Sequence, residues 1–383
     1  MRRESSMTSR RRFLGTASAA MACAVTAARL ASAGGKPKAS SRRRSPWIDA
    51  LGFPIEADAS PFAPLGERTL DALRASGLSA VNVTVGGAGD YAKDFDTSVR
   101  TIAHFNQEIA AHPDRLMQVR TAADIAQAQL NGRMGLIYGF QDGTPIGEDL
   151  GRIDLFADLG VRVFQLTYNR RNLIADGCLE PGNAGLSAFG NEVVARLNER
   201  RLLVDLSHGG ERMTREAIEA SRAPVAITHT GCAALAPLPR NKTDAELRML
   251  ADKGGVVGIY LIPMFLRAQG HPGAEDLVLH IEHAIDVCGE DHVGIGSDGF
   301  IPPVKFDDAY RERADKRMAE RRARGIAAPG ERPGVYTFLP DLNTADRFAQ
   351  LAQRLASRGH SESRIDKILG GNFARLFAAV WAS

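Results

Sequence analysis

The feature that most constrains the fold is a regular alternation of short apolar runs and amphipathic segments that begins at Trp47. Eight runs are rich in valine and isoleucine, and their apolar residues are mostly consecutive, as expected for parallel strands covered on both faces. The runs are 47–51, 80–85, 134–140, 161–167, 202–207, 224–229, 255–261 and 292–298. Segments with helical periodicity, such as 189–199 and 243–252, separate most of them. The pattern predicts an α/β fold, a single-domain (β/α)8 TIM barrel over residues 47–383 with C-terminal helices.

A doubly wound open sheet is the alternative that the same alternation allows. In its dinucleotide-binding form, that fold has a G-x-G-x-x-G turn after an early strand. The chain has no such motif after its first predicted strands, so this form is not supported.

The first 33 residues are predicted to be an export signal rather than part of the fold. Paired arginines at positions 10 and 11 precede a weakly apolar, alanine-rich run that ends in the small-residue cleavage site Ala31-Ser32-Ala33. A short buried helix is disfavoured by the six arginines of this segment, and the run is too short and too weakly apolar to cross a membrane. The pattern is typical of a twin-arginine signal, so we expect the twin-arginine export machinery as a partner and the bacterial periplasm as the destination.

Charge is divided unevenly along the chain. Residues 34–46 contain five basic residues among glycine, serine and proline, and they are predicted to be a flexible linker. The formal charge is +3 for the whole chain, but the first 33 residues carry +5 and the linker another +5, so the remainder carries −7. An exported protein with an acidic body is not expected to bind nucleic acid. The three cysteines after the signal have no C-x-x-C spacing, so a thiolate zinc site is not indicated, and their odd number predicts a free thiol or an intermolecular pair.

Polar residues that follow the predicted strands are the candidate site. In (β/α)8 barrels, catalytic groups lie at the C-terminal mouth. The residues at these strand ends are Gln141, Asp142, Tyr168, Asn169, His208, His229 and Asp298. A single strand-end histidine is usually structural, but His208 and His229 on adjacent strands, with Asp298 on the eighth, favour a divalent metal site, with zinc as the usual ion. Asp298 would take a proton from water or complete the metal's ligand shell.

Six segments of the chain together carry a pattern that is specific enough to compare with known families. They are GVRVFQLTYNRRNLIADGC, GLSAFGNEVVARLNERRLLVDLSH, APVAITHTGCAAL, PRNKTDAELRMLADKGGVVGI, HVGIGSDG and KILGGNFARLF. With these segments the chain resembles the membrane (renal-type) dipeptidase family from about Trp47 to Phe377. The resemblance implies a zinc peptidase with a (β/α)8 barrel of the amidohydrolase group.

Part of the family's site carries over to this chain. The family holds two zinc ions, and the resemblance assigns the histidine ligands of strands 5 and 6 to His208 and His229. It assigns the arginine that binds the substrate carboxylate to Arg240, in P-R-N, and the proton-shuttling aspartate to Asp298. Tyr168 is expected to act in catalysis and, with Asn169, in substrate binding.

Other family residues are replaced, so the chain looks like a divergent subgroup that lacks several metal ligands. Leu51 and Phe53 stand where the family has histidine and aspartate, Gln141 replaces the bridging glutamate, and Tyr168 replaces a histidine near the scissile bond. Leucine and phenylalanine have no donor atoms, and one neutral amide oxygen is a poor bridge between two cations. We therefore expect one metal ion, held by His208 and His229, with Gln141 as a weak ligand and Asp142 or Asp298 as further candidates.

The remaining candidates are predicted to be structural or solvated. Asp49 keeps the family's first strand-1 aspartate and is expected in a deeper layer of the barrel. Asp142 is expected to be solvated in its loop, and the charge-rich segment 308–325 to be a solvated helix that takes no part in the chemistry. Histidines away from the mouth have the same expectation: His280 and His283 structural, His271 solvated.

These observations predict an exported dipeptidase-like metallohydrolase that cleaves dipeptides or similar small amides with one metal ion. Two alternatives stay open, a tailoring enzyme for a peptide natural product and a catalytically degenerate, metal-free binding protein of the same fold. The joint presence of His208, His229, Arg240 and Asp298 weighs against the metal-free binder. A small dipeptide-like substrate is the expected ligand, and a homodimer is left open.

Overall fold

The computed structural model describes residues 45–60, 62–267, 269–332 and 334–381. The predicted export signal (1–33) and residues 34–44 of the predicted linker lie outside this part of the chain. These described residues form one compact unit. No helix in the described part has both the length and the apolar content that crossing a membrane requires.

Eight parallel strands form the central barrel, and neighbours in sequence are neighbours in the sheet. They are β1 (Ile48–Asp49), β3 (Ala80–Thr84), β5 (Met134–Phe140), β6 (Val161–Gln165), β7 (Leu203–Asp205), β8 (Ala226–Thr230), β9 (Val256–Ile259) and β10 (Val293–Ile295). Each lies in one of the eight predicted runs, with β8 one residue longer at its end. The predicted (β/α)8 fold is confirmed.

The ring is nearly closed between its first and last strands. The backbone N–H of Ala50 donates to the carbonyl of Ile295 at 2.9 Å. One layer above, β2 (Gly52–Phe53) pairs in parallel with β11 (Gly299–Phe300). One further strand, β4 (Leu116–Gln118), pairs with the first three residues of β5 and was not predicted.

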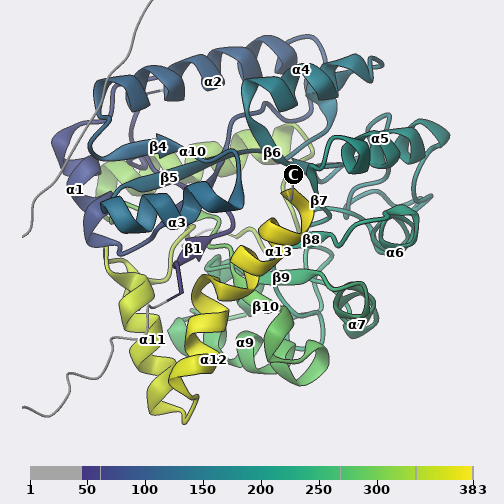
Figure 1. Cartoon of the computed structure of the whole chain (residues 1–383). Helices are drawn as coiled ribbons and strands as arrows, with labels where there is room; N and C mark the ends of the chain where they lie inside the picture. The colour runs from purple at the N-terminus through teal and green to yellow at the C-terminus, as the bar shows by residue number, and fades with distance from the viewer. Residues whose placement is uncertain (1–44, 61, 268, 333, 382–383) are drawn as a thin grey trace, which may run out of the picture. The chain divides into compact units, whose positions relative to one another are not determined.

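Helices surround the strands, as Figure 1 shows. They are α1 (Glu67–Ala75), α2 (Asp94–Ala111), α3 (Ala122–Asn131), α4 (Gly151–Leu159), α5 (Ala188–Glu199), α6 (Glu211–Ala220), α7 (Asp244–Asp252), α8 (Pro263–Leu266), α9 (Ala274–Cys288), α10 (Asp308–Ala323), α11 (Arg347–Ser357), α12 (Glu362–Asp366) and α13 (Asn372–Trp381). Local sequence sets several of their starts. Thr121 at α3 and Thr243 at α7 each form a capping box with the acidic residue three positions later, which satisfies backbone N–H groups that the helix leaves unpaired.

Helix α13 closes the N-terminal end of the barrel. Its residues Phe373, Leu376 and Phe377 are buried in one cluster with Ile48 and Ala80, which begin β1 and β3. Burying each of these large side chains stabilises the fold by about 1.5–3 kcal/mol. In the view of Figure 1, α13 crosses in front of the strands and α10 lies behind them. The open end of the barrel is therefore the C-terminal mouth.

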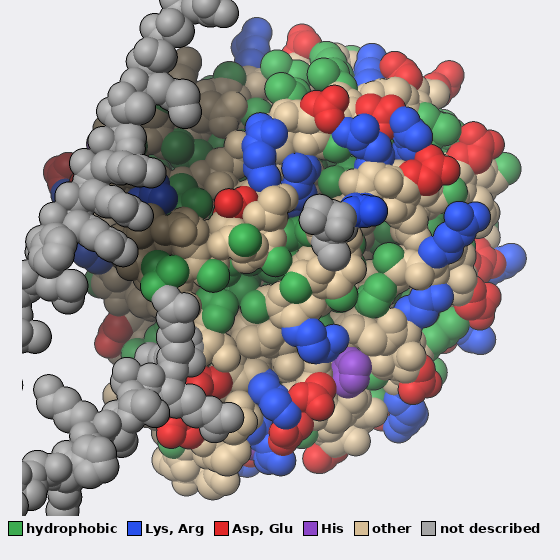
Figure 2. Space-filling model, in the orientation of Figure 1, with side chains coloured by type: hydrophobic (Ala, Val, Ile, Leu, Met, Phe, Trp, Pro, Cys, Tyr) green, Lys and Arg blue, Asp and Glu red, His purple; other side chains and the backbone are tan. Residues whose placement is uncertain are grey.

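Acidic and basic side chains lie among one another over the face drawn in Figure 2. Nucleic-acid-binding domains instead gather lysine and arginine on one face or stripe. The face in view shows no such stripe among the described residues.

Candidate active site at the mouth of the barrel

A cavity of about 360 Å³ lies at the C-terminal mouth. Six of the predicted site residues line it: Gln141, Tyr168, Asn169, His208, Arg240 and Asp298. His229 is fully buried directly behind His208, with 3.0 Å between the two Nε2 atoms. The strand-end positions thus bring these side chains together from strands that are far apart in sequence.

Hydrogen bonds orient the His208 ring. The Nδ1 atom of His208 lies 2.6 Å from Oδ1 of Asn169, whose amide nitrogen donates to the carbonyl of Ile326 at 2.8 Å. Because an amide oxygen only accepts hydrogen bonds, the His208 proton is on Nδ1 and the Nε2 lone pair of the neutral ring faces His229.

The His229 ring is held from behind by the D-L-S-H turn. Its Nδ1 lies 2.9 Å from Oγ1 of Thr228, and Thr228 and Ser207 both donate to the buried carboxylate of Asp205. Burial lowers the pKa of both His208 and His229 well below its ordinary value, and the Arg240 charge adds to the effect. Both rings are therefore neutral near pH 7, the protonation state that a metal-binding imidazole requires.

The donor set does not fit a two-metal centre. Leu51 is buried without a donor atom, and the Phe53 side chain lines the cavity. Within the described residues, no three His, Cys, Asp or Glu side chains come together in a group that could hold a metal ion. The protein thus offers two convergent imidazole nitrogens, one fewer than the three protein ligands usual for catalytic zinc.

Asp298 lies at the seam of the barrel in a strained conformation. Its φ of 52° is in the left-handed region, which non-glycine residues rarely adopt outside turns and functional sites. Its N–H donates to the carbonyl of Leu51 at 2.8 Å, which ties the residue to the first strand. Burial raises the pKa of Asp298 to about 6, although nearby arginines and a hydrogen bond from Gln141 oppose the shift. A carboxylate with such a pKa is suited to act as a base near neutral pH.

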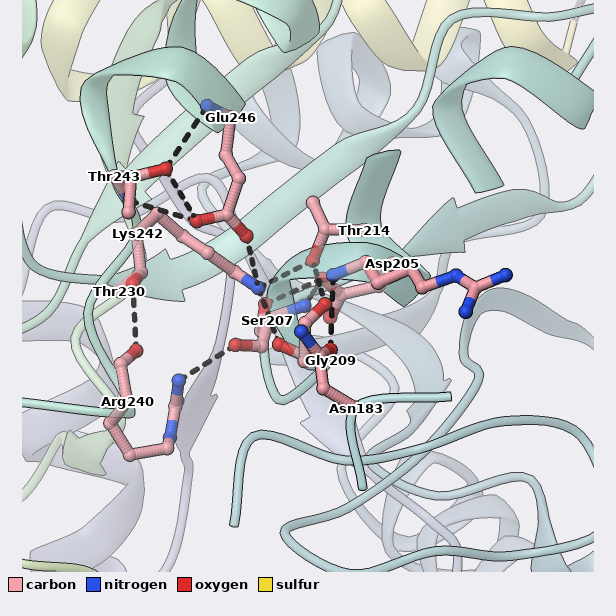
Figure 3. A network of polar contacts seen from close by, with 12 residues as sticks. Asn183, Asp205, Ser207, Gly209, Thr214, Thr230, Arg240, Lys242, Thr243 and Glu246 are labelled. Atoms are coloured by element: carbon pink, nitrogen blue, oxygen red, sulfur yellow. Dashed lines mark hydrogen bonds and ion pairs between the residues drawn. The ribbon is translucent and has the colours of Figure 1, made fainter. Parts of the chain in front are cut away.

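Arg240 is buried and supports both histidine loops. Its Nη1 donates to the carbonyl of Ser207 at 2.7 Å, a contact drawn in Figure 3. Its Nη2 donates to the carbonyl of His229 at 3.3 Å. The neighbouring Lys242 donates to the carbonyl of Gly209 at 2.7 Å and pairs with Glu246 at 3.2 Å. A guanidinium has five N–H donors, so Arg240 keeps donors for a ligand in the cavity that it lines.

Tyr168 stacks on His208, with ring centroids 4.2 Å apart and planes 25° from parallel. Its Oη accepts a hydrogen bond from Nη1 of Arg321 at 3.3 Å, so the phenol proton is left to donate elsewhere. Arg321, on α10, also forms a two-pronged pair with Glu331, at 2.7 and 2.9 Å. The positively charged Arg321 guanidinium therefore contacts the Tyr168 hydroxyl. The sequence did not predict Arg321 as a site residue.

The prediction that segment 308–325 takes no part in the site is wrong. One face of α10 forms part of the cavity wall. Its arginines share that face because residues four apart lie on the same side of a helix. The wall residues of this helix are Tyr310, Arg313, Ala314, Arg317, Met318 and Arg321. The four-residue spacing of apolar Tyr310, Ala314 and Met318 is the sequence signal for a packed face, and the surrounding charges obscured it.

The prediction of a solvated Asp142 is also wrong. The side chain is buried and accepts a hydrogen bond from the Asn172 amide at 2.8 Å. Burial raises its pKa to about 6. Asp142 is not among the residues that line the cavity, whereas its neighbour Gln141 is.

The predictions for Asp49 and for the histidines away from the mouth are confirmed. Asp49 lies buried in a deeper layer, where it accepts hydrogen bonds from the N–H and Oγ of Ser297 at 2.7 and 2.6 Å. His280 is structural, with its two ring nitrogens 2.9 Å from the N–H of Cys232 and the carbonyl of Leu266. His283 lies 2.8 Å from an Asp244 oxygen, and His271 is exposed. All three described cysteines are free thiols.

Comparison with known proteins identifies relatives along most of the chain. The model of the family "Membrane dipeptidase (Peptidase family M19)" matches residues 63–311. Dipeptidase verJ of Clonostachys rogersoniana is 30% identical over 274 residues, 71% of this chain but 62% of that protein, so the match spans less than two thirds of this relative.

Two solved structures extend the comparison to the fold. An amidohydrolase from Pseudomonas aeruginosa is 32% identical with a TM-score of 0.75, and the match covers 88% of this chain and 97% of the other. A metallopeptidase from Rhodobacter sphaeroides, liganded with a phosphinate mimic of the dipeptide L-Ala-D-Ala, is 21% identical with a TM-score of 0.70, covering 88% of this chain and 100% of that one. At 21% identity, the second likeness concerns the fold alone.

Proposed function

The chain belongs to the membrane dipeptidase family, peptidase family M19, and from this premise we propose that it is an exported hydrolase of dipeptides or similar small amides. One observation carries the proposal: in a chain of this family, His208, Arg240, Tyr168 and Asp298 line a single cavity at the barrel mouth. The cavity, of about 360 Å³, has room for a small ligand.

Each of these side chains has a different role in the proposed amide hydrolysis. The free donors of Arg240 bind the substrate carboxylate, and Asn169 lines the same cavity. Asp298 takes a proton from the attacking water and returns it to the leaving amine. The Tyr168 hydroxyl, which accepts from Arg321, donates its own proton in a hydrogen bond to the carbonyl oxygen as negative charge develops there.

The proposed cofactor is one zinc ion per chain, in place of the two that the family resemblance implies. His208 and His229 would hold it, with the Gln141 amide oxygen as a weak additional donor and Asp298 as a further candidate. Their two Nε2 atoms lie 3.0 Å apart, so one ion could accept the lone pairs of both rings. A zinc ion in this position would supply Lewis acidity to the substrate carbonyl.

The proposed location is the bacterial periplasm. The paired arginines and the Ala31-Ser32-Ala33 site support export through the twin-arginine machinery. Replacing both Arg10 and Arg11 with lysine should leave the full-length precursor in the cytoplasm, as read by cell fractionation. Equal amounts of processed wild type and variant in the periplasm would contradict this route.

Dipeptide hydrolysis and dipeptide binding, measured together, test the function. We expect the purified protein to bind and hydrolyse L-Ala-D-Ala or L-Ala-L-Ala, and Asp298→Asn to reduce turnover by about a hundredfold or more while calorimetric binding persists. Binding without turnover in the zinc-loaded wild type would instead identify a binding protein. If neither these two dipeptides nor any other dipeptide binds at any zinc concentration, the proposed function is wrong.

A further inference from the structure

Three arginines of α10 face the cavity at four-residue intervals. Arg313, Arg317 and Arg321 all line its wall, on the side of the barrel opposite α13. Residues four apart on a helix share one face, so the three guanidinium groups form a row across the mouth.

The three arginines differ in how their charge is compensated. Arg321 is held by the two-pronged pair with Glu331, and its side chain is 23% exposed. Arg313 lies 3.9 Å from Asp58, and both of these side chains are about half exposed, so water screens the pair. Arg317, in contrast, has no hydrogen-bond or ion-pair partner among the residues that the structure describes.

Charge on the cavity wall is therefore unbalanced. Four arginines line it, against the two carboxylates of Asp298 and Glu331. Arg317 lines the same cavity as Asp298 and Arg240, and its positive charge, like that of Arg240, opposes the rise in the pKa of Asp298. Much of the remaining wall is apolar, and low-dielectric walls strengthen the field of such charges. The large apolar residues away from α10 are Phe53, Ile262, Met264, Phe265, Phe300 and Val335.

A simple dipeptide has one carboxylate, and the proposed function assigns it to Arg240. The excess positive charge then has no counterpart in a neutral substrate. Resting on that proposed function, we propose that the enzyme selects dipeptide-like substrates with a second carboxylate, in a side chain, and that Arg317 is the residue that recognises it. Arg317 is exposed before the substrate binds, and its guanidinium can pair with a carboxylate through two parallel hydrogen bonds.

A matched pair of ligands tests this inference. L-Ala-L-Glu and L-Ala-L-Gln have nearly the same shape and differ in one negative charge, and the corresponding L,D dipeptides repeat the comparison in the other configuration. Calorimetry with the full chain should give a dissociation constant about tenfold or more lower for the glutamate dipeptide. The preference should diminish as ionic strength rises, because Arg317 is exposed to solvent.

Two variants of α10, each lacking one positive charge, separate direct recognition of the side-chain carboxylate by Arg317 from a general electrostatic effect of the helix. Arg317→Gln should bring the two dissociation constants together by weakening the glutamate dipeptide alone. Lys316→Gln removes the same charge from the neighbouring exposed position, which is not part of the cavity wall, and should keep the preference. Circular dichroism checks that both variants retain the fold.

Each contrary outcome has its own meaning. Equal binding of the two dipeptides by the wild type, with hydrolysis of both, would overturn the inference and leave the proposed function intact. An equal loss for both dipeptides in Arg317→Gln would show that Arg317 binds the main-chain carboxylate instead, and an equal effect of Lys316→Gln would show an unspecific field. Failure of every dipeptide to bind would overturn the proposed function and the inference together.

Discussion

Single residues decide how many metal ions the site can hold. Leu51 and Phe53 offer no donor atoms, whereas His208 and His229 converge with Nε2 atoms 3.0 Å apart. We expect elemental analysis to find about one divalent ion per chain in protein purified without chelator. His208→Ala and His229→Ala should each reduce this occupancy strongly, because a single imidazole cannot replace the set.

A control for the metal measurement is His280→Ala, because His280 is a structural histidine away from the mouth. This variant should keep its metal if the protein remains folded. Two tightly held ions per chain in the wild type, or none after incubation with zinc, would contradict the assignment.

Arg240 has two tasks that one substitution can separate. Lysine keeps the charge, but it lacks the planar fork that holds the carbonyls of Ser207 and His229 and matches a carboxylate. Arg240→Lys should weaken dipeptide binding at least about tenfold and also lower the free energy of unfolding by about 1–3 kcal/mol, since buried carbonyls lose donors. Calorimetry and urea denaturation measure the two effects. Unchanged binding would rule out the anchor role, and unchanged stability would rule out the supporting one.

The origin of the residues explains which of them could be predicted from the sequence. Those at strand ends, such as His208 and Asp298, follow from counting strands, because the barrel brings all strand ends to one mouth. Arg321 contacts Tyr168 across 153 residues of sequence, from a helix outside the repeating units. No local sequence pattern encodes such a contact, so the many charges of this helix led to the prediction that it is exposed to solvent.

At the scale of elements, the same distinction holds. The eight barrel strands were predictable because strands covered on both faces need consecutive apolar residues. Strand β4 has only three residues, Leu-Met-Gln, which are too few to show a period. Helix α10 shows only a weak apolar face, because arginines, whose charge suggests solvent, share its cavity side with Tyr310, Ala314 and Met318.

The contact between α10 and the loop that follows β6 leads to a prediction about these two elements. If Arg321 acts through Tyr168, then Tyr168→Phe and Arg321→Gln should each lower kcat by roughly tenfold to a hundredfold. The double variant should be little worse than either single one, because both remove the same hydrogen-bonded unit. Lys316→Gln, on the same helix but away from the cavity, should keep the wild-type kcat. Multiplicative losses in the double variant would show that the two residues act independently.

At the scale of the whole molecule, one buried carboxylate helps to close the barrel. Asp49 on the first strand accepts two hydrogen bonds from Ser297, 248 positions later, just after the last barrel strand. Burial raises the pKa of Asp49 to about 7, although the hydrogen bonds from Ser297 and the Arg347 charge oppose the shift. The folded protein therefore keeps a proton on Asp49 at pH values where the unfolded chain, with an ordinary aspartate pKa near 3.8, has lost it.

The raised pKa of Asp49 fixes the sign of its effect on stability. Its contribution to the free energy of unfolding is fully present below about pH 4 and is lost as the pH rises through about 7, because the folded state binds the extra proton. Asparagine in its place cannot ionise, so the difference in unfolding free energy between wild type and Asp49→Asn should shift against the wild type between pH 4 and 8, by an amount on the order of a few kcal/mol. Urea denaturation at several pH values measures the difference, and comparing the two proteins cancels the opposing effect of the buried neutral histidines. A difference that is constant over this range, or that moves in favour of the wild type, would mean that Asp49 is already ionised in the folded barrel.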